Sequence, residues 1–152
     1  MSSVDERLSA MGIILPTATP PVATYVSFKQ DGETVHISGQ LSTAADGGIK
    51  GVVGDDVSRE RGVEAARLCA VNLMSQMRAA AGGDLDRVDV MRLGVFVQAG
   101  ATFWEIPAVA NGCSDLIVAA FGARGTHVRS AVGVYRLPFN FAVEVDATLR
   151  LV

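Results

Sequence analysis

Residues 127–151 read HVRSAVGVYRLPFNFAVEVDATLRL, and the alternation within them decides the fold. Apolar side chains recur at every second position in both halves of the stretch, with polar side chains between them. A period of two predicts β-strands that bury one face. The alternation breaks at Pro138. We therefore expect a hairpin of two antiparallel strands, residues 127–136 and 141–151, with its turn near this proline.

The residues before this hairpin predict another hairpin, two helices and one more strand. Asp31-Gly32 is a turn pair between two β-rich runs. Apolar residues at steps of three and four give the first long helix a single apolar stripe. Pro107 favours the first turn of the second helix, where proline costs no hydrogen bond. In chain order we expect a hairpin at residues 24–41, a helix at 58–81, a strand at 87–99 and a helix from about 107.

This order, β-β-α-β-α-β-β, predicts an α+β protein with one mixed sheet and two helices on one face. Residues 1–152 are expected to form a single domain. Residues 1–23 form an N-terminal extension, with a short helix at 3–11 and an extended, proline-containing segment at 14–23. A glycine-rich loop at 42–56 follows the first hairpin.

The composition predicts self-association. Hydrophobic residues make up 49% of the 152 residues and charged residues only 19%, and the mean hydropathy is +0.33. No stretch is continuously apolar over the roughly 20 residues that a membrane span needs, so we expect no membrane partner. A subunit interface would bury the excess apolar surface, and we therefore expect a homo-oligomer.

The net charge and the two cysteines indicate which partners and which cellular location to expect. The net charge is −3 and the sequence contains no basic run, so we expect no nucleic-acid partner. Cys69 and Cys113 lack metal-ligand spacing and fall among apolar residues on the expected helices. We interpret both as reduced core thiols of a cytoplasmic protein.

The common catalytic constellations find little support in the sequence. Ser38, His127 and Asp146 could supply a Ser-His-Asp triad, but no G-x-S-x-G elbow surrounds the serine. Cys-His catalysis would need an exposed cysteine. His36 and His127 are the only histidines, with no third ligand at metal spacing, so we expect no metal site. The glycine-rich loop lacks the Lys-Ser/Thr of a phosphate loop.

Arg129 and Glu144 are the polar residues that the strand pattern leaves unexplained. Arg129 shares a strand face with the small residues Ala131 and Gly133, which leaves room beside its guanidinium. A planar guanidinium suits a carboxylate. Two plain alternatives remain open, an edge ion pair of Arg129 with an acid of the last strand and simple exposure of Glu144. The expected hairpin places Arg129 opposite residue 147 or 148, so it is not directly across from Glu144.

Four segments together show a family resemblance. Each is weak alone, but their order and spacing are specific, and the resemblance extends over nearly the whole length of the chain. The chain resembles the RidA family, also called YjgF/YER057c/UK114. The segments are HISGQL (36–41), the long helix with Asn72-Leu73, VANGCSDL (109–116) and VRSAVGVYRLPFNFAVEVDA (128–147).

The resemblance implies a chorismate-mutase-like fold, assembled as a homotrimer with sites between subunits. It also implies hydrolysis of reactive enamines and imines (2-imino acids) to 2-keto acids and ammonium, without cofactor or metal. Arg129 matches the arginine that holds the substrate carboxylate, and Glu144 matches the glutamate near the attacking water. The residues expected to line the substrate pocket are Tyr25, Ser38, Gly39, Asn111 and Ala131.

One departure from the family pattern stands beside Arg129. Better-characterised members have a cysteine where this chain has Ala131, so the chain resembles a divergent bacterial subgroup. The alternative function is a small-carboxylate-binding or regulatory trimer without turnover. The endoribonuclease or translation-inhibitor activity associated with the family is disfavoured by the acidic balance. A chorismate mutase would need more than one cation around its dianionic substrate.

Overall fold

The computed structural model describes residues 2–21 and 23–152. Val22, which belongs to the expected extended segment, lies outside the described residues. The helices are α1 (Val4–Ala10), α2 (Arg59–Ala80) and α3 (Ile106–Phe121), with short 3-10 turns η1 (Leu85–Arg87), η2 (Gly122–Gly125) and η3 (Pro138–Asn140). The strands are β1 (Phe28–Asp31), β2 (Thr34–Leu41), β3 (Val88–Gln98), β4 (Val128–Val134) and β5 (Val143–Leu151).

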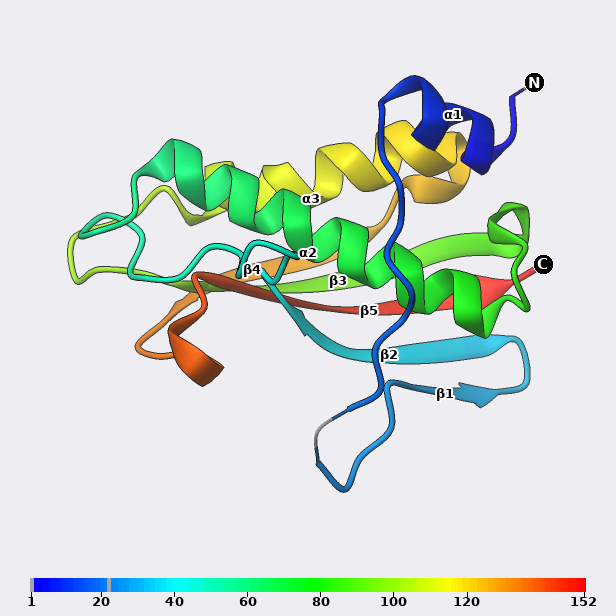
Figure 1. Ribbon diagram of the computed structural model, residues 1–152, viewed down its shortest axis with the longest axis horizontal. Coiled ribbons are helices and arrows are strands. Elements are labelled where there is room, and N and C mark those ends of the chain that lie inside the picture. Colours follow the sequence, from blue (N-terminus) through cyan, green and yellow to red (C-terminus); the bar gives the residue numbers. More distant parts are fainter. Residues whose placement is uncertain (1, 22) are drawn as a thin grey trace.

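The expected α+β architecture is confirmed. The five strands form one mixed sheet in the order β1-β2-β5-β3-β4. Figure 1 shows α2 and α3 side by side on one face of this sheet, with α1 against the end of α3. Within residues 2–21 and 23–152, no α-helix covers the opposite face. The sheet therefore has one helix-covered face and one open face.

The expected C-terminal hairpin is wrong. β4 pairs in parallel with β3, and β3 pairs antiparallel with β5, so β3 lies between β4 and β5. Leu93 of β3 has Arg129 on one side and Ala147 on the other. The alternation predicted both strands, but strand pairing depends on the connections. The segment between β4 and β5 is long enough to step across the end of β3, and α3 supplies the crossover that parallel β3 and β4 need.

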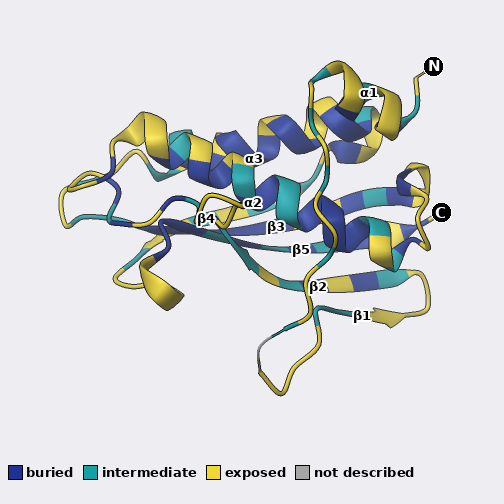
Figure 2. Cartoon of the chain, viewed as in Figure 1, coloured by how far each residue is buried: buried dark blue, intermediate teal, exposed yellow. Residues whose placement is uncertain are grey.

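The core lies between the helices and the covered face of the sheet (Figure 2). In β5 every second side chain is buried, which confirms the predicted alternation. β3 is irregular: its register against β5 shifts between Val90 and Arg92. Met91 falls in this bulge and is 45% exposed, which explains why it breaks the apolar pattern of the strand.

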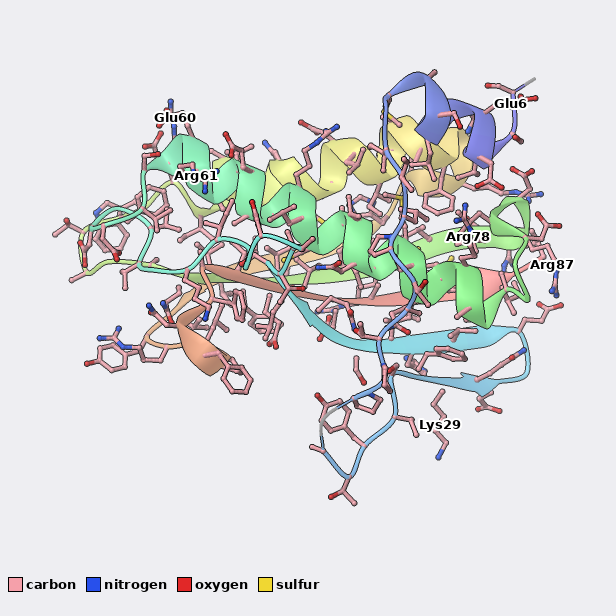
Figure 3. The ribbon with its side chains drawn as sticks, viewed as in Figure 1. Glu6, Lys29, Glu60, Arg61, Arg78 and Arg87 are labelled. Atoms are coloured by element: carbon pink, nitrogen blue, oxygen red, sulfur yellow. The ribbon has the colours of Figure 1, made fainter. Side chains whose placement is uncertain are left out.

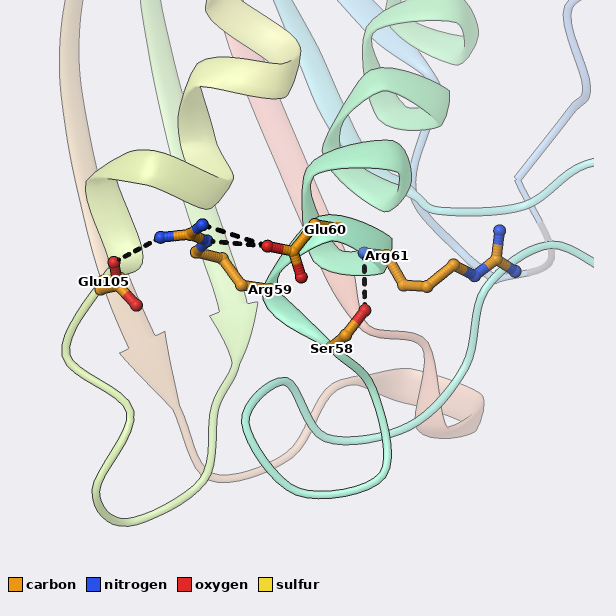
Figure 4. A network of polar contacts seen from close by, with 5 residues as sticks. All are labelled: Ser58, Arg59, Glu60, Arg61 and Glu105. Carbon is orange, nitrogen blue, oxygen red and sulfur yellow. Dashed lines mark hydrogen bonds and ion pairs between the residues drawn. The ribbon is translucent and has the colours of Figure 1, made fainter.

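Helices α2 and α3 approach each other closely because Gly112 has no side chain. A Cβ at Gly112 would lie 2.1 Å from the carbonyl oxygen of Val63 in α2. The same two helices are joined at their N-termini (Figure 4), where Arg59 of α2 donates to Glu105, the residue before α3, over 2.8 Å. Ser58 caps α2 by accepting from the Arg61 backbone N–H.

Charged side chains lie at both ends of α2, an acidic one in its first turn and a basic one in its last turn. In Figure 3, Glu60 projects near the N-terminal end of α2 and Arg78 near its C-terminal end. This placement complements the helix dipole, which is positive at the N-terminus. Arg78 also forms an ion pair with Asp5 of α1. The ion pair connects the N-terminal helix to the main body of the domain.

The expected short N-terminal helix is confirmed as α1. Ser3 forms a capping box with Glu6, and Val4 and Leu8 are buried in the core. After α1, the chain runs across α2 to reach β1 (Figure 1). Gln76 of α2 holds this crossing by donating to the Thr19 carbonyl oxygen over 3.0 Å. Helix α1 is therefore part of the packed structure, and the segment that follows it is anchored to α2 at Thr19.

One apolar stretch meets the length and composition of a membrane span without being continuously apolar. Residues 106–125 are long and apolar enough to cross a membrane by length and composition alone. In the structure they form α3 and η2, and the apolar face of α3 packs into the core against α2 and the sheet. This packing accounts for the apolar side chains of α3.

Gln98, at the end of β3, is a buried polar residue that fixes the connection between β4 and β5. Its Nε2 donates to the Gly51 carbonyl oxygen over 2.9 Å and to Oδ1 of Asn140 over 2.8 Å. Its Oε1 accepts from the Leu137 backbone N–H over 2.6 Å. Phe139 and Asn140 adopt positive φ in this connection. The Gln98 amide therefore stabilises a backbone conformation that these residues rarely adopt.

We predict that Gln98→Leu lowers the free energy of unfolding by about 2–3 kcal/mol, because the Leu137 N–H and the Gly51 carbonyl lose their buried partner. Urea unfolding followed by circular dichroism measures the change. Gln30→Leu is the control, since Gln30 is exposed in β1 and should cost less than about 0.5 kcal/mol. Equal costs for the two variants would contradict the role of Gln98.

Candidate functional site

Arg129 lies on the helix-covered face of β4, at the edge of the sheet. Its Nη1 donates to Oδ1 of Asn111 over 2.8 Å and to Oγ of Ser114 over 3.2 Å, both on α3. The edge ion pair considered from the sequence is not formed, because the acids of β5, Glu144 and Asp146, lie on the opposite face of the sheet, with β3 between β5 and β4. Among the described residues, no carboxylate lies within ion-pair distance of Arg129. The guanidinium therefore keeps its charge available for an acidic ligand.

Ser114 and His127 are two polar residues that were not expected from the sequence to lie beside Arg129. Ser114 Oγ lies 2.9 Å from Nε2 of His127, and Nδ1 of His127 lies 2.6 Å from the Gly125 carbonyl oxygen. The spacing Asn111-x-x-Ser114 places both side chains on one face of a helix and could have indicated the cluster. His127 could also have been found from the sequence, because it lies two residues before Arg129 and side chains two apart in a strand share a face.

Tyr25, Ser38 and Gly39 line a second region, a groove of about 230 Å³ between the β1–β2 hairpin and the segment that precedes it. The pairing of β2 with β5 shifts between Ile37 and Gln40, which places Ser38 and Gly39 in a bulge. Ser38 Oγ donates to the Val26 carbonyl oxygen over 2.6 Å. The structure thus brings three of the expected pocket residues together.

Glu144 lies beside this groove, on the open face of the sheet. A Cβ on Gly39 would stand 2.8 Å from Cδ of Glu144, so the carboxylate occupies the space that glycine leaves. Partial burial raises the pKa of Glu144 above its ordinary value, and the nearby Asp146 carboxylate raises it further. A carboxylate with a raised pKa is a stronger base than an ordinary glutamate.

The expected site residues therefore fall into two groups, which one chain does not bring together. Arg129, Asn111 and Ala131 lie on or against the helix-covered face, whereas Glu144 lies on the open face. β5 and β3 separate β2 from β4. Three strand spacings amount to about 14 Å across the sheet. A small molecule cannot touch both groups within one chain.

The other constellations considered from the sequence are not assembled. Of the triad candidates, Ser38 contacts Val26, Asp146 contacts Arg92 and His127 contacts Ser114. Both cysteines are buried, as expected. Burial raises the pKa of the Cys113 thiol to about 12, which opposes a nucleophilic role. Within the described part of the chain, no three His, Cys, Asp or Glu side chains cluster as metal ligands would.

The mixed sheet with two helices on one face and an arginine at its edge defines an α+β domain of the chorismate-mutase-like class. The family model described as "YjgF/chorismate_mutase-like, putative endoribonuclease" matches residues 5–147. The chain therefore belongs to this family, the RidA family of the sequence analysis.

Three proteins illustrate what this chain is similar to. Protein TCP17 of Trypanosoma cruzi is 48% identical over 151 residues, which cover 97% of this chain and 94% of the relative. The crystal structure of Atu1372 of Agrobacterium tumefaciens, a protein of unknown function, is 40% identical with a TM-score of 0.92. The match covers 98% of this chain and 92% of Atu1372. The 2-iminobutanoate/2-iminopropanoate deaminase of Dermatophagoides farinae is 26% identical over 89% of this chain and 91% of that protein.

We predict that Asp146→Asn lowers the pKa of Glu144, because removal of a nearby negative charge favours the ionised form. The pKa should stay above its ordinary value, since burial is the larger cause and remains. Carbon-13 NMR titration of the glutamate carboxyl carbons measures the shift. Asp115→Asn, on the exposed side of α3, is the matched control and should leave the pKa of Glu144 unchanged.

Proposed function

We propose that the protein hydrolyses small 2-imino acids to 2-keto acids and ammonium, without a metal or cofactor. The observation that carries this proposal is the guanidinium of Arg129, which faces no carboxylate among the described residues and is held by two acceptors of α3. The deaminase named among the relatives supports the choice of reaction. In this proposal, Arg129 binds the substrate carboxylate and Glu144 acts on the attacking water.

The chemistry requires few protein groups. The carbon of a protonated C=N bond is already electrophilic, so water can attack it once the substrate is fixed in place. Glu144 accepts a proton from the water as the new C–O bond forms, which gives a carbinolamine. Glu144 then returns this proton to the nitrogen of the intermediate. As the C–N bond breaks and the C=O bond forms, the hydroxyl proton passes to Glu144 and on to the released ammonia, which leaves as ammonium. One water is consumed for each C=N bond cleaved, and no covalent enzyme intermediate is needed.

The two groups of site residues would meet across a subunit boundary of a homotrimer. Because one chain holds Arg129 and Glu144 on opposite faces, an active site in this proposal needs a second copy of the chain. Val128 and Val132 of β4 are 68% and 46% exposed on the open face, as expected of a surface that another subunit covers. The buried thiols agree with the proposed cytoplasmic location.

One observation favours a second candidate, a carboxylate-binding trimer without turnover. A guanidinium can bind a small acid without a catalytic carboxylate, and Glu144 lies on the opposite face of the sheet from Arg129. Ala131 also departs from the cysteine of the family pattern. This candidate predicts binding of 2-oxobutanoate without product formation from any imine. The endoribonuclease in the family description is the weakest alternative, since a chain of net charge −3 without a basic run lacks the electrostatic footprint of RNA binding.

We predict that Arg129→Ala lowers kcat/KM for 2-iminobutanoate by about 100-fold or more, because the charged contacts to the substrate carboxylate are lost. The imine is generated in situ by an amino-acid oxidase, and keto-acid release is followed. Arg67→Ala, at an exposed arginine of α2, is the control and should retain wild-type activity. Wild-type protein that fails to accelerate release from several imino acids would refute the proposed activity.

A subunit-mixing experiment tests the shared site. Arg129→Ala and Glu144→Gln chains should each be inactive as separate trimers. When the two are refolded together at equal amounts, about one site in four receives an intact Arg129 from one chain and an intact Glu144 from its neighbour. We therefore predict recovery of about a quarter of the wild-type activity. A site formed within one chain would show no recovery, because neither variant contains both residues.

A further inference from the structure

In the guanidinium of Arg129, both hydrogens of Nη1 are used in hydrogen bonds, whereas the edge formed by Nε and Nη2 makes none with the described residues. Nη1 carries two hydrogens, and these are accepted by Asn111 and Ser114. In the described part of the chain, Nε and Nη2 of Arg129 have no hydrogen-bond partner. The Nε–Nη2 edge is one of the two edges that can grip a carboxylate with two parallel hydrogen bonds. The contacts with α3 therefore select which edge remains for a ligand.

The proton positions behind this selection follow from the chemistry of the partners. A carbonyl oxygen can only accept, so the 2.6 Å contact with Gly125 requires the hydrogen of a neutral His127 to sit on Nδ1. Nε2 then has a free lone pair, and the Ser114 hydroxyl must donate to it over 2.9 Å. With its hydrogen directed at His127, Ser114 presents a lone pair to Nη1 of Arg129.

We propose that Ser114 and His127 are positioning residues that commit Nη1 of Arg129 to α3 and thereby reserve its Nε–Nη2 edge for a carboxylate. The inference rests on the proposed role of Arg129 as the carboxylate anchor. An arginine side chain loses much rotamer freedom when it is held in one orientation, and this loss would otherwise accompany ligand binding. Ser114 and His127 therefore preorganise the anchor without touching the ligand.

Ser114 is better suited to this role than Asn111 alone. Ser114 is 9% exposed and is fixed in the packed part of α3, whereas Asn111 is exposed. His127 in turn prevents the serine hydroxyl from pointing its hydrogen at the cation. Loss of either residue should let the guanidinium sample other orientations while leaving its charge intact. The expected effect is weaker binding of carboxylates with little change in the rate of chemistry.

Binding of 2-oxobutanoate, measured by titration calorimetry, tests the proposal without any turnover. Ser114→Ala should weaken binding about tenfold, as the loss of one hydrogen bond to a charged group implies. Ser114→Thr should restore the affinity to within about threefold, because it keeps the hydroxyl. Ser75→Ala is the matched control, a buried helix serine that bonds only within α2, and it should bind normally.

Two further readouts separate positioning from a general structural role. The neutral analogue 2-oxobutanamide should bind wild type and Ser114→Ala alike, and kcat should change less than about twofold while KM rises about tenfold. Nitrogen-15 NMR at alkaline pH should show His127 protonated at Nδ1 and unprotonated at Nε2.

The outcomes distinguish this inference from the proposed function. Protonation at Nε2, unchanged binding in Ser114→Ala, absence of rescue by Ser114→Thr, or a wild-type protein that binds no carboxylate would each overturn the positioning role. Normal carboxylate binding that depends on Ser114, with no imine hydrolysis, would refute the proposed reaction and leave the positioning role in place.

Discussion

The parallel pairing of β3 with β4 is the constraint on which the rest of the structure depends. It places β3 between β4 and β5 and makes α3 the crossover that covers β4. Arg129 consequently faces α3, where two acceptors hold it, and Glu144 faces the open side two strands away. Had β4 paired directly with β5, the two residues would lie on adjacent strands. The strand order thus decides that the candidate site is divided.

Gln98 shows how this topology is stabilised at its least regular point. The chain must leave β4, pass the end of β3 and enter β5, and it does so through a connection with two non-glycine residues at positive φ. A buried side-chain amide at the end of β3 binds both this connection and the glycine-rich loop at Gly51. The crossing segment is therefore fixed by the strand that it crosses.

Much of the fold could be predicted from the sequence, because local periodicity reports burial directly. The alternation in β5, the apolar stripe of α2 and the proline in the first turn of α3 all correspond to observed elements. Met91, which interrupts the apolar alternation of β3, lies in the bulge where the pairing with β5 shifts. Strand partners were not predictable in this way, because alternation shows which face is buried and carries no information about the neighbouring strand.

The candidate site could be predicted only in part, because contacts between elements are not visible in the sequence pattern. Arg129 and Asn111 could be named, but their contact with Ser114 and His127 depends on how α3 packs on β4.

Gly39 has a consequence for how sequences of this type can vary. Its backbone does not require glycine through a positive φ, because the restriction is one of space: any Cβ would stand 2.8 Å from Cδ of Glu144. Positions 39 and 144 therefore constrain each other, although they are far apart in the chain. A substitution at position 39 would displace the carboxylate before it disturbed the fold, so a protein redesigned at this position could keep its stability and still lose the geometry of Glu144.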